Sequence, residues 1–359
     1  MARIVLGISG GVDSAVAGLL LKRQGHEVIG LFMHNWEEVD GKGVCTAEED
    51  FDYVKKVCEK LDIPYYSVNY SKQYKEKVFN QFISDYSKGL TPNPDVLCNR
   101  EIKFGPFLDF ALTLNADYIA TGHYAGVFHG EKEHLLLKAA DENKDQTYFL
   151  CQLNQYQLSK ALFPLEKLNK PQVREIALSA GLASAKRKDS TGVCFIGERN
   201  FPDFLSRYLN CAQGDITDVK GNVLAKHKGL MLYTRGQRKG LGLGGCGDGI
   251  EGRWFVLDKD LHNNRLIVSH GDESALYDGG CVAGAFNWIP SIPHEKTFEC
   301  QCRFRHRQKE QSVTVEILSQ DRCRIIAREK QRALALGQFA VLYKDNFCLG
   351  GGVVEEILS

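Results

Sequence analysis

The sequence lacks any run of 18 apolar residues, the length that a membrane-spanning helix needs, so we expect no membrane span. It also lacks net charge, because 45 Lys and Arg balance 45 Asp and Glu. There is no internal repeat and no low-complexity segment, and because there is no CxxC pair we expect no structural metal site. A strand-like run begins at Ile4, which leaves no room for a signal or transit peptide and predicts a cytoplasmic protein.

The composition is that of a folded chain of several domains. Its 359 residues are 43% hydrophobic and 25% charged, which excludes a disordered or collagen-like protein. Shifts in composition predict three domains, at residues 1–210, 211–278 and 279–359. Twelve cysteines are scattered along the chain, and in a reducing compartment most of them are expected to be core thiols.

Charge is unevenly distributed in spite of the neutral total. Residues 161–240 contain 14 Lys and Arg against 7 Asp and Glu, a net charge of +7. Residues 35–62 contain 4 against 9, a net charge of −5. The basic region is expected either to contact an anionic partner or to form a solvated face, so neutrality does not exclude nucleic acid.

The N-terminal part predicts an α/β domain with a doubly wound parallel sheet. Short apolar runs alternate with amphipathic segments, and we expect strands at residues 4–8, 28–33, 65–69 and 118–121. In such a sheet, ligands bind beyond the carboxyl ends of the strands. Residues 170–210 are helical in pattern and basic, and residues 236–252 are rich in glycine. From residue 279 onward, β-like runs at 298–304, 312–318, 323–327 and 339–343 predict a small barrel.

The most specific motif follows the first expected strand and opens a helix. Its small residues leave backbone N–H groups uncovered at a helix N-terminus, where an anion is favoured. A tight turn capped by Asp13 or Ser14 is the alternative. The motif resembles the PP-loop of ATP pyrophosphatases, which binds the pyrophosphate of ATP. It comprises Gly7, Ile8, Ser9, Gly10, Gly11, Val12, Asp13 and Ser14. Met33 and Gly122 end later strands and are either adenosine contacts or a core Met and a turn Gly.

Two cysteines lie in basic surroundings. Cys98 follows a proline-stiffened loop near an expected helix N-terminus, beside Arg100 and Lys103. Cys194 is preceded by residues 186–188, all basic, and followed by Arg199. Nearby positive charge stabilises the reactive thiolate, so these two thiols are the candidates for chemistry.

Six motifs together resemble the tRNA-specific 2-thiouridylase family. They are the PP-loop octet, PNPDVLCN at 92–99, GHY at 122–124, KDQTY at 144–148, STGVCFI at 190–196 and GQRKGLG at 236–242. The resemblance implies an adenine-nucleotide α-hydrolase-like N-terminal domain, a small central domain and a C-terminal β-barrel. It also implies 2-thiolation of the wobble uridine, U34, in tRNAs for Lys, Glu and Gln.

The resemblance assigns roles to individual residues. ATP, with Mg²⁺ expected, would adenylate the C2 oxygen of U34. Cys194 would hold a persulfide delivered by a cysteine-desulfurase relay, and Cys98 would be the nucleophile, leaving a transient Cys98–Cys194 disulfide. Alternatively, the Cys194 persulfide attacks C2 directly. Asp95 would act as general acid/base or form an Asx turn. The positions matching the family's contacts to the target base and the tRNA anticodon loop are Asn93, Pro94, Asp95, His123, Lys144, Asp145, Gln146, Phe304, Arg305 and Gln338.

Some positions depart from the family pattern or admit another role. His306, Leu336 and Arg235 differ from the residues usual there, and His123 could equally be a structural histidine. Two rival functions are a PP-loop ligase or amidotransferase-type synthetase, and an RNA-binding protein without catalysis. The first gives no reason for two cysteines in basic settings, and the second leaves the phosphate loop unused.

Overall fold

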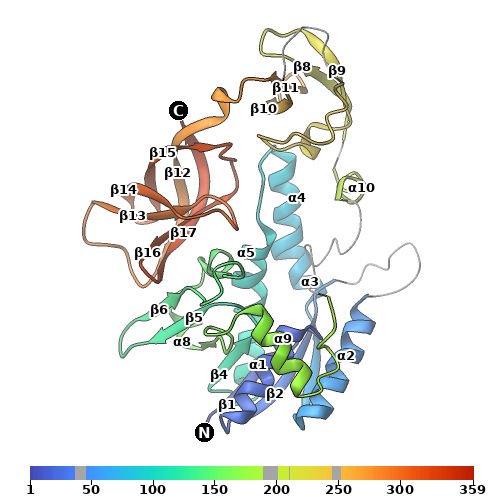
Figure 1. Ribbon diagram of the computed structural model, residues 1–359, viewed down its shortest axis with the longest axis vertical. Helices are drawn as coiled ribbons and strands as arrows, with labels where there is room; N and C mark the ends of the chain where they lie inside the picture. The colour runs from blue at the N-terminus through green and yellow to red at the C-terminus, as the bar shows by residue number, and fades with distance from the viewer. Residues whose placement is uncertain (37–45, 189–200, 210, 245–251) are drawn as a thin grey trace.

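The computed structural model describes residues 1–36, 46–188, 201–209, 211–244 and 252–359, which form three sheets (Figure 1). The first sheet has the order β3-β2-β1-β4-β7, and all its neighbouring strands are parallel. The four predicted strands are confirmed within one residue at each end, and a fifth, β7, was not predicted. The strands are β1 (Arg3–Gly7), β2 (Glu27–His34), β3 (Tyr65–Asn69), β4 (Tyr118–Thr121) and β7 (Ala161–Leu162).

Helices cover both faces of this sheet, as a doubly wound fold requires. Alternate residues of β1 enter different cores, Ile4 and Leu6 on one face and Val5 on the other. The Ile4 face is covered by α1 (Val12–Arg23), α2 (Thr46–Leu61) and α9 (Lys170–Ser179). The Val5 face is covered by α3 (Ser71–Tyr74), η1 (Lys75–Phe79), α4 (Asn80–Ser87), α5 (Pro94–Cys98), η2 (Asn99–Lys103) and α6 (Pro106–Thr113).

The C-terminal domain is a closed antiparallel barrel, as predicted. Its strand order is β12-β15-β14-β13-β16-β17, and a β12–β17 pairing closes it. The sequence patterns found the four middle strands but not the two twelve-residue strands that close the barrel. The strands are β12 (Tyr277–Trp288), β13 (Thr297–Arg303), β14 (Gln311–Ser319), β15 (Arg322–Arg332), β16 (Phe339–Lys344) and β17 (Phe347–Leu358).

A hairpin of the N-terminal part extends the barrel sheet. Its strands β5 (Gly126–His129) and β6 (His134–Leu137) pair with each other, and β6 pairs with β17 through Leu137 and Phe347. The core on the Val5 face also continues into the barrel at Phe339 and Val341. A shared apolar core and a shared sheet fix these two domains relative to one another. Short helices α7 (Thr147–Leu150) and α8 (Gln155–Ser159) follow the hairpin.

A smaller sheet of order β10-β11-β8-β9 forms the central domain, at the top of Figure 1. Helix α4 extends from the parallel sheet towards it, and Lys259 donates a hydrogen bond of 3.1 Å to the carbonyl of Gly89, just beyond that helix. The elements are α10 (Phe201–Leu205), β8 (Gly214–Thr217), β9 (Val223–His227), η3 (Leu230–Leu232), β10 (Trp254–Asp260), β11 (Arg265–His270) and η4 (Ser274–Leu276).

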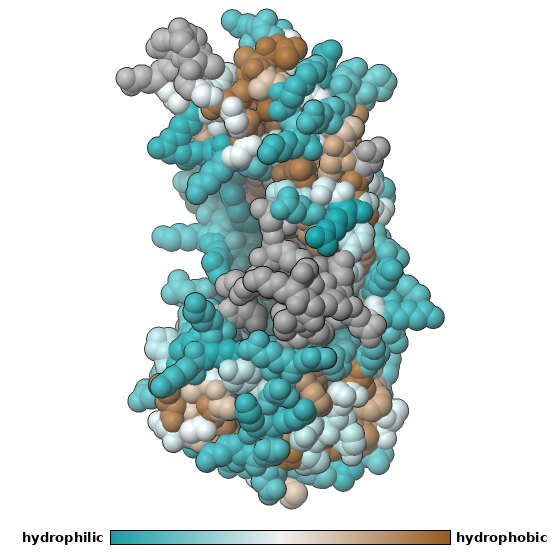
Figure 2. All heavy atoms as spheres, turned by 90° about the vertical axis from the view of Figure 1, so that its right-hand side faces the viewer, coloured by the Kyte–Doolittle hydropathy of each residue, from teal (hydrophilic) through white to brown (hydrophobic). Residues whose placement is uncertain are grey.

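The surface is largely polar on the face that Figure 2 shows, and apolar side chains gather at its upper end, over the central domain. Within the described residues, no helix combines the length and the apolar character needed to cross a membrane. Of the region expected to be helical between residues 170 and 210, the described part is helical only in α9 and α10.

Candidate functional site

The phosphate loop connects β1 to α1 at the carboxyl edge of the parallel sheet. Gly10 has a φ of +74°, a conformation that favours glycine. The backbone N–H of Ser9 donates to the Ser14 hydroxyl at 3.2 Å, and that hydroxyl lies 3.2 Å from the Gly11 carbonyl. The helix begins after Gly11 without a side-chain cap. The first turn of α1 is therefore built to present backbone donors to an anion.

Gly122 and Met33 lie against this loop. A Cβ atom on Gly122 would be 2.7 Å from the backbone nitrogen of Ser14, so only glycine allows β4 to end so close to the first turn of α1. The Met33 methyl lies 3.7 Å from the position that a Cβ on Gly7 would take. The structure thus brings together the residues expected to bind ATP.

Asp13 does not cap the helix, contrary to the role considered for it. Its carboxylate accepts hydrogen bonds from Lys170 Nζ at 2.7 and 2.9 Å and from the Tyr124 hydroxyl at 2.9 Å. Lys170 is the first residue of α9, whose N-cap is Asn169. Sequence reasoning missed Lys170 because nothing local links it to a residue 157 positions away.

Arg187 closes the other side of the loop. Its guanidinium donates to the Gly10 carbonyl at 3.2 Å, forms an ion pair with Asp50 and lies 4.5 Å from the ring centre of Tyr53. Burial raises the pKa of Asp50, and the hydrogen bond from Arg187 opposes that rise. This cation, one of those expected to support Cys194, contacts the phosphate loop. Cys194 itself, with residues 189–200, lies outside the described residues.

Several other cations of the basic region also form internal ion pairs. Lys170 pairs with Asp13 and Arg235 with the buried carboxylate of Asp278. The net charge of +7 therefore overstates the positive charge that the region offers to a partner.

The Cys98 segment is a short helix that continues as a π-helical turn. Asn93 caps it, accepting from the backbone N–H groups of Asp95 and Val96 at 3.2 and 3.4 Å, and Pro94 follows as the first helical residue. Cys98 is the last residue of α5, and 3% of its surface is exposed. Cys98 was expected near a helix N-terminus, and the helix begins at Pro94, so Cys98 lies one turn beyond that start. The Asx role considered for Asp95 belongs to Asn93.

The two cations expected to support Cys98 have other partners. Arg100 donates to Glu101 and to Gln152, each at 2.8 Å, and Lys103 Nζ lies 3.3 Å from His123 Nε2. Gln152 donates in turn to the barrel carbonyls of Ala285 and Gly351. The segment around Cys98 is thereby linked to the barrel through Arg100 and Gln152.

Asp95 lies in a setting that suits proton transfer. Burial raises the pKa of its carboxyl group, and the charge of Lys103 partly offsets that rise. A carboxyl group with a raised pKa retains a proton more readily near neutral pH, which a general acid needs.

His123 is buried, with 8% of its surface exposed, and both ring nitrogens have partners inside the chain. Lys103 can only donate, so Nε2 accepts from it and the Nδ1–H donates to the Thr121 hydroxyl at 2.7 Å. Burial, together with Lys103, lowers the pKa of His123 well below 6.5. The structure therefore favours the structural role over a direct tRNA contact.

Residues 144–146 differ in their surroundings: the first is partly exposed, the second contacts the barrel and the third contacts Tyr124. Lys144 is partly exposed. Asp145 is buried and accepts from Arg303 of the barrel at 2.6 Å, so its carboxylate is not available to RNA. The side-chain oxygen of Gln146 accepts a hydrogen bond from the backbone N–H of Tyr124 at 2.9 Å, and the backbone N–H of Gln146 donates to the Tyr124 carbonyl. Gln146 thus orients Tyr124, the residue that contacts Asp13.

The barrel residues expected to contact RNA differ in exposure. The Phe304 side chain, just beyond the end of β13, is 4% exposed and packs in the barrel core with Cys300 and Cys302, so an RNA contact for it is not supported. Arg305 is exposed. Gln338 is engaged on both ends of its amide, donating to Thr91 at 2.8 Å and accepting from Tyr148 at 3.4 Å.

Most other cysteines are core residues, as expected. Burial raises the pKa values of Cys58, Cys281 and Cys300 to about 12, which keeps these thiols protonated and unreactive. Within the described residues, no group of three or more His, Cys, Asp or Glu could hold a metal ion.

Three family models match the chain in succession. They are described as the tRNA methyl transferase HUP domain (residues 2–198), the tRNA methyl transferase PRC-barrel domain (202–270) and the aminomethyltransferase beta-barrel domain (268–354). The tRNA-specific 2-thiouridylase MnmA of Alkaliphilus oremlandii is 53% identical over 358 residues, covering 99% of this chain and 98% of that protein. The chain belongs to the MnmA family.

A second MnmA, from Bacillus cytotoxicus, is 53% identical over 356 residues and covers 99% of this chain and 95% of its own. MnmA proteins are tRNA sulfurtransferases of the ATP-using PP-loop group, so the chain is an enzyme of that group. Among solved structures, a 4-thiouridine synthetase in complex with RNA and ATP is similar at a TM-score of 0.35 and 16% identity, over 58% of this chain and 49% of that one. At that score the similarity supports no conclusion about the site.

Proposed function

We propose that this chain converts U34 of tRNAs for Lys, Glu and Gln to 2-thiouridine, consuming ATP and releasing AMP and pyrophosphate. One observation carries the proposal beyond family membership: two consecutive residues join the phosphate loop to the cysteine segment. Gly122 packs on Ser14 of the loop, and His123 contacts Lys103 at the end of the helical run that contains Cys98. A nucleotide in the loop and a base beside Cys98 would then lie near one another.

The first step is activation of the base. The C2 oxygen of uridine is a poor leaving group and must first be activated. It attacks the α-phosphorus of ATP to form an adenylate, and pyrophosphate leaves into the loop at residues 9–14. Backbone N–H groups and the N-terminus of α1 stabilise the departing charge. Asp95, with its raised pKa, exchanges the proton that the base must lose or regain.

Sulfur then replaces the AMP oxygen at C2. A persulfide on Cys194 supplies it, loaded by a cysteine-desulfurase relay. In one route, the Cys98 thiolate attacks Cys194 Sγ, hydrosulfide leaves and attacks C2, and AMP departs. In the other, the terminal persulfide sulfur attacks C2 and displaces AMP, and the Cys98 thiolate then attacks Cys194 Sγ and breaks the S–S bond, which releases the thiolated base. Both routes end in a Cys98–Cys194 disulfide, and a thiol reductant must supply two electrons before the next turnover.

The test is thiolation of a tRNA transcript with anticodon UUU, incubated with ATP, cysteine and a desulfurase relay. Nucleoside mass spectrometry should detect 2-thiouridine with the native enzyme, and none with Cys98→Ser or Cys194→Ser. Cys211→Ser is the matched control, because Cys211 is partly exposed and lies outside the site. ATP-dependent pyrophosphate release should persist in Cys194→Ser.

Each rival outcome has a distinct meaning. Thiolation retained by Cys194→Ser would contradict the persulfide role, and a native enzyme that makes no 2-thiouridine would overturn the function. Pyrophosphate release that needs an amino acid or a small acid in place of tRNA would instead support a PP-loop ligase.

A further inference from the structure

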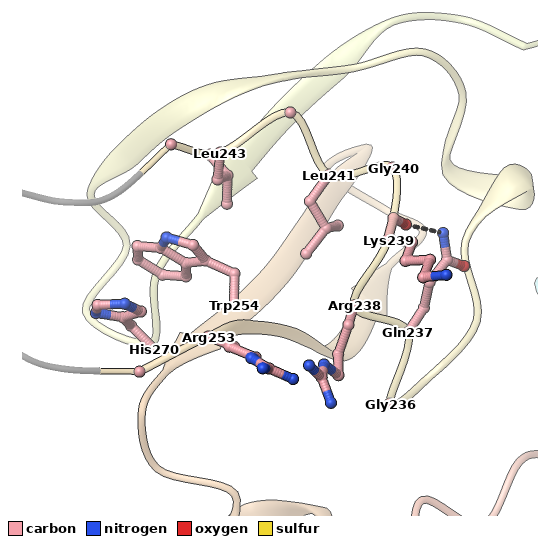
Figure 3. A pocket seen from close by; sticks show the side chains of 13 residues that line it. Gly236, Gln237, Arg238, Lys239, Gly240, Leu241, Leu243, Arg253, Trp254 and His270 are labelled. Atoms are coloured by element: carbon pink, nitrogen blue, oxygen red, sulfur yellow. Dashed lines mark hydrogen bonds between the residues drawn. The ribbon is translucent and has the colours of Figure 1, made fainter.

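The glycine-rich loop of the central domain has no part in the chemistry described above, yet it forms one wall of a pocket of about 760 Å³ (Figure 3). Residues 236–244 line one side, and Arg253, Trp254 and His270 line the other. The pocket therefore lies between a loop and the first residues of β10 and last of β11.

The first part of the loop, residues 236–239, is anchored by hydrogen bonds to β10 and within the loop. The Gly236 N–H donates to the Val256 carbonyl at 2.8 Å, and the Val256 N–H donates to the Gln237 carbonyl at 3.0 Å. The Gln237 side chain accepts from the Thr234 N–H and donates to the Lys239 carbonyl at 2.9 Å, the contact drawn in Figure 3. A binding surface that is already ordered loses little conformational entropy when it binds a ligand.

The described wall carries three exposed cations, Arg238, Lys239 and Arg253, and no carboxylate. No ion pair joins these cations to any carboxylate of the described residues, whereas nearby Arg235 pairs with Asp278 and Arg332 with Glu273. Asp248 and Glu251, in the adjoining segment, lie outside the described residues.

Arg238 and Arg253 point toward one another across the lower edge of the pocket (Figure 3). The Arg238 guanidinium lies 5.7 Å from the ring centre of Phe255, which orients it without neutralising its charge. Two guanidinium groups that face each other repel. An anion bound between them would be attracted by both groups, and this attraction would offset their mutual repulsion.

The glycines leave space above the loop backbone. A Cβ on Gly242 or Gly244 would meet nothing within 4 Å, and Gly240 and Gly242 have positive φ values of 81° and 68°. A ligand can therefore approach the main chain closely along an open groove, which suits an extended polymer better than an enclosed small molecule.

We propose that this pocket binds a phosphodiester group of the tRNA backbone between Arg238 and Arg253, with Lys239 as an additional contact. The proposal rests on the proposed function for the identity of the RNA. It adds a phosphate subsite in the central domain, separate from the phosphate loop. Phosphate contacts position the RNA and carry no base readout, so this subsite sets affinity and register rather than the identity of the modified base.

The experiment measures binding of the UUU-anticodon tRNA transcript as a function of salt concentration. Removing a phosphate contact lowers the slope of log affinity against log salt by about 0.9. The double variant Arg238→Gln/Arg253→Gln should bind about tenfold more weakly at moderate salt and show a slope smaller by about 1. Thiolation should show a raised KM for tRNA and an unchanged kcat at saturating tRNA.

Arg322→Gln is the matched control, because Arg322 is an exposed barrel arginine already paired with Glu355 and Glu356. Unchanged tRNA affinity and slope in a folded double variant would overturn the subsite. A raised KM for ATP with unchanged tRNA binding would also overturn it and indicate a nucleotide site. A native enzyme that binds tRNA with the expected salt slope but does not thiolate U34 would refute the proposed function and leave the subsite standing; one that binds no tRNA would refute both.

Discussion

Lys170 Nζ lies 2.7 Å from Asp13 Oδ1, joining the first residue of α9 to the first turn of α1. The Tyr124 hydroxyl contacts the same oxygen at 2.9 Å. The Lys170 side chain is only 11% exposed, so the contact is shielded from bulk water. Lys170 is thus a positioning residue for the phosphate loop, and it neutralises a carboxylate beside the place where phosphates would bind.

Lys170→Met should weaken ATP binding. It leaves the Asp13 carboxylate without its cation, and that negative charge then opposes the phosphates. Losing a hydrogen bond to a charged group costs about 1.5–3 kcal/mol, so we expect the KM for ATP in pyrophosphate release to rise at least about tenfold. Lys170→Arg should recover part of the loss, and Lys167→Met, an exposed lysine nearby, should have no effect. An unchanged KM in Lys170→Met would contradict the positioning role.

Gln338→Leu should lower kcat more than it changes the KM for ATP. Gln338 donates to the carbonyl of Thr91, and the Thr91 N–H donates to Leu336 at 2.8 Å, so the barrel holds the segment that leads to Cys98. Loss of that anchor displaces the cysteine segment and leaves the phosphate loop intact. Gln301→Leu, another barrel glutamine, is the control. A raised KM for tRNA alone, reduced by low salt, would instead favour the RNA contact first predicted for Gln338.

Asp145 and Arg303 should show strong coupling in a double-mutant cycle. Their side chains are 1% and 11% exposed, and removing one member of a buried pair costs about 3–5 kcal/mol because the other charge is left uncompensated. Asp145→Asn and Arg303→Met should each lower the urea midpoint, and the double variant should lose less than the sum of the two. The exposed pair Arg322 and Glu355, treated in the same way, should show a coupling below about 1 kcal/mol. Additive losses for the buried pair would mean that the ion pair does not join the two domains.

His123 should make the protein sensitive to acid. Burial lowers the pKa of His123 in the folded protein well below 6.5, so the folded state favours the neutral imidazole. The stabilisation is present above pH 6.5 and is lost as the pH falls towards the folded pKa, because the unfolded chain takes up a proton first. His123→Asn should flatten the decline in thermal stability below pH 6.5. His262→Asn, which alters an exposed histidine, should leave it unchanged, and an equally steep decline in His123→Asn would refute the assignment.

Substitution of Phe304 should lower the stability of the protein, whereas substitution of Arg305 should weaken its binding to tRNA. Phe304→Ala removes a ring from the barrel core and should cost about 3–5 kcal/mol, with little change in the tRNA affinity of the folded fraction. Arg305→Gln should leave stability nearly unchanged and reduce the salt slope of tRNA binding by about 0.9. The measurements are urea unfolding and filter binding, and the reverse pattern would restore Phe304 as the contact.

The sequence predicted best what depends on neighbouring residues. The strands at residues 65–69 and 118–121 match β3 and β4, because each is a short apolar run bounded by polar turns. The glycine and serine pattern of the phosphate loop is local in the same way. Strand β17 escaped detection because it contains three consecutive glycines. The structure explains one of them, since a Cβ on Gly350 would lie 1.8 Å from the Asn287 carbonyl of the paired strand.

What the sequence could not show depends on contacts between distant segments. Lys170, Tyr124 and Arg187 surround the phosphate loop from other parts of the chain, and no spacing rule connects them to it. Similarly, family motifs indicated that Asp145 and Phe304 matter, but not whether they face RNA or the interior. That distinction follows from burial, which only the fold reveals.

The pairing of β6 with β17 has a consequence for synthesis of the chain. Leu137 and Phe347 are neighbours in the sheet but 210 residues apart in sequence. At typical translation rates of about 5–20 residues per second, β6 would wait roughly 10–40 seconds on the ribosome before its partner strand exists. During that interval the hairpin exposes an unpaired edge, which is the kind of surface that chaperones cover. We therefore expect the catalytic half to complete its folding only after translation of the barrel.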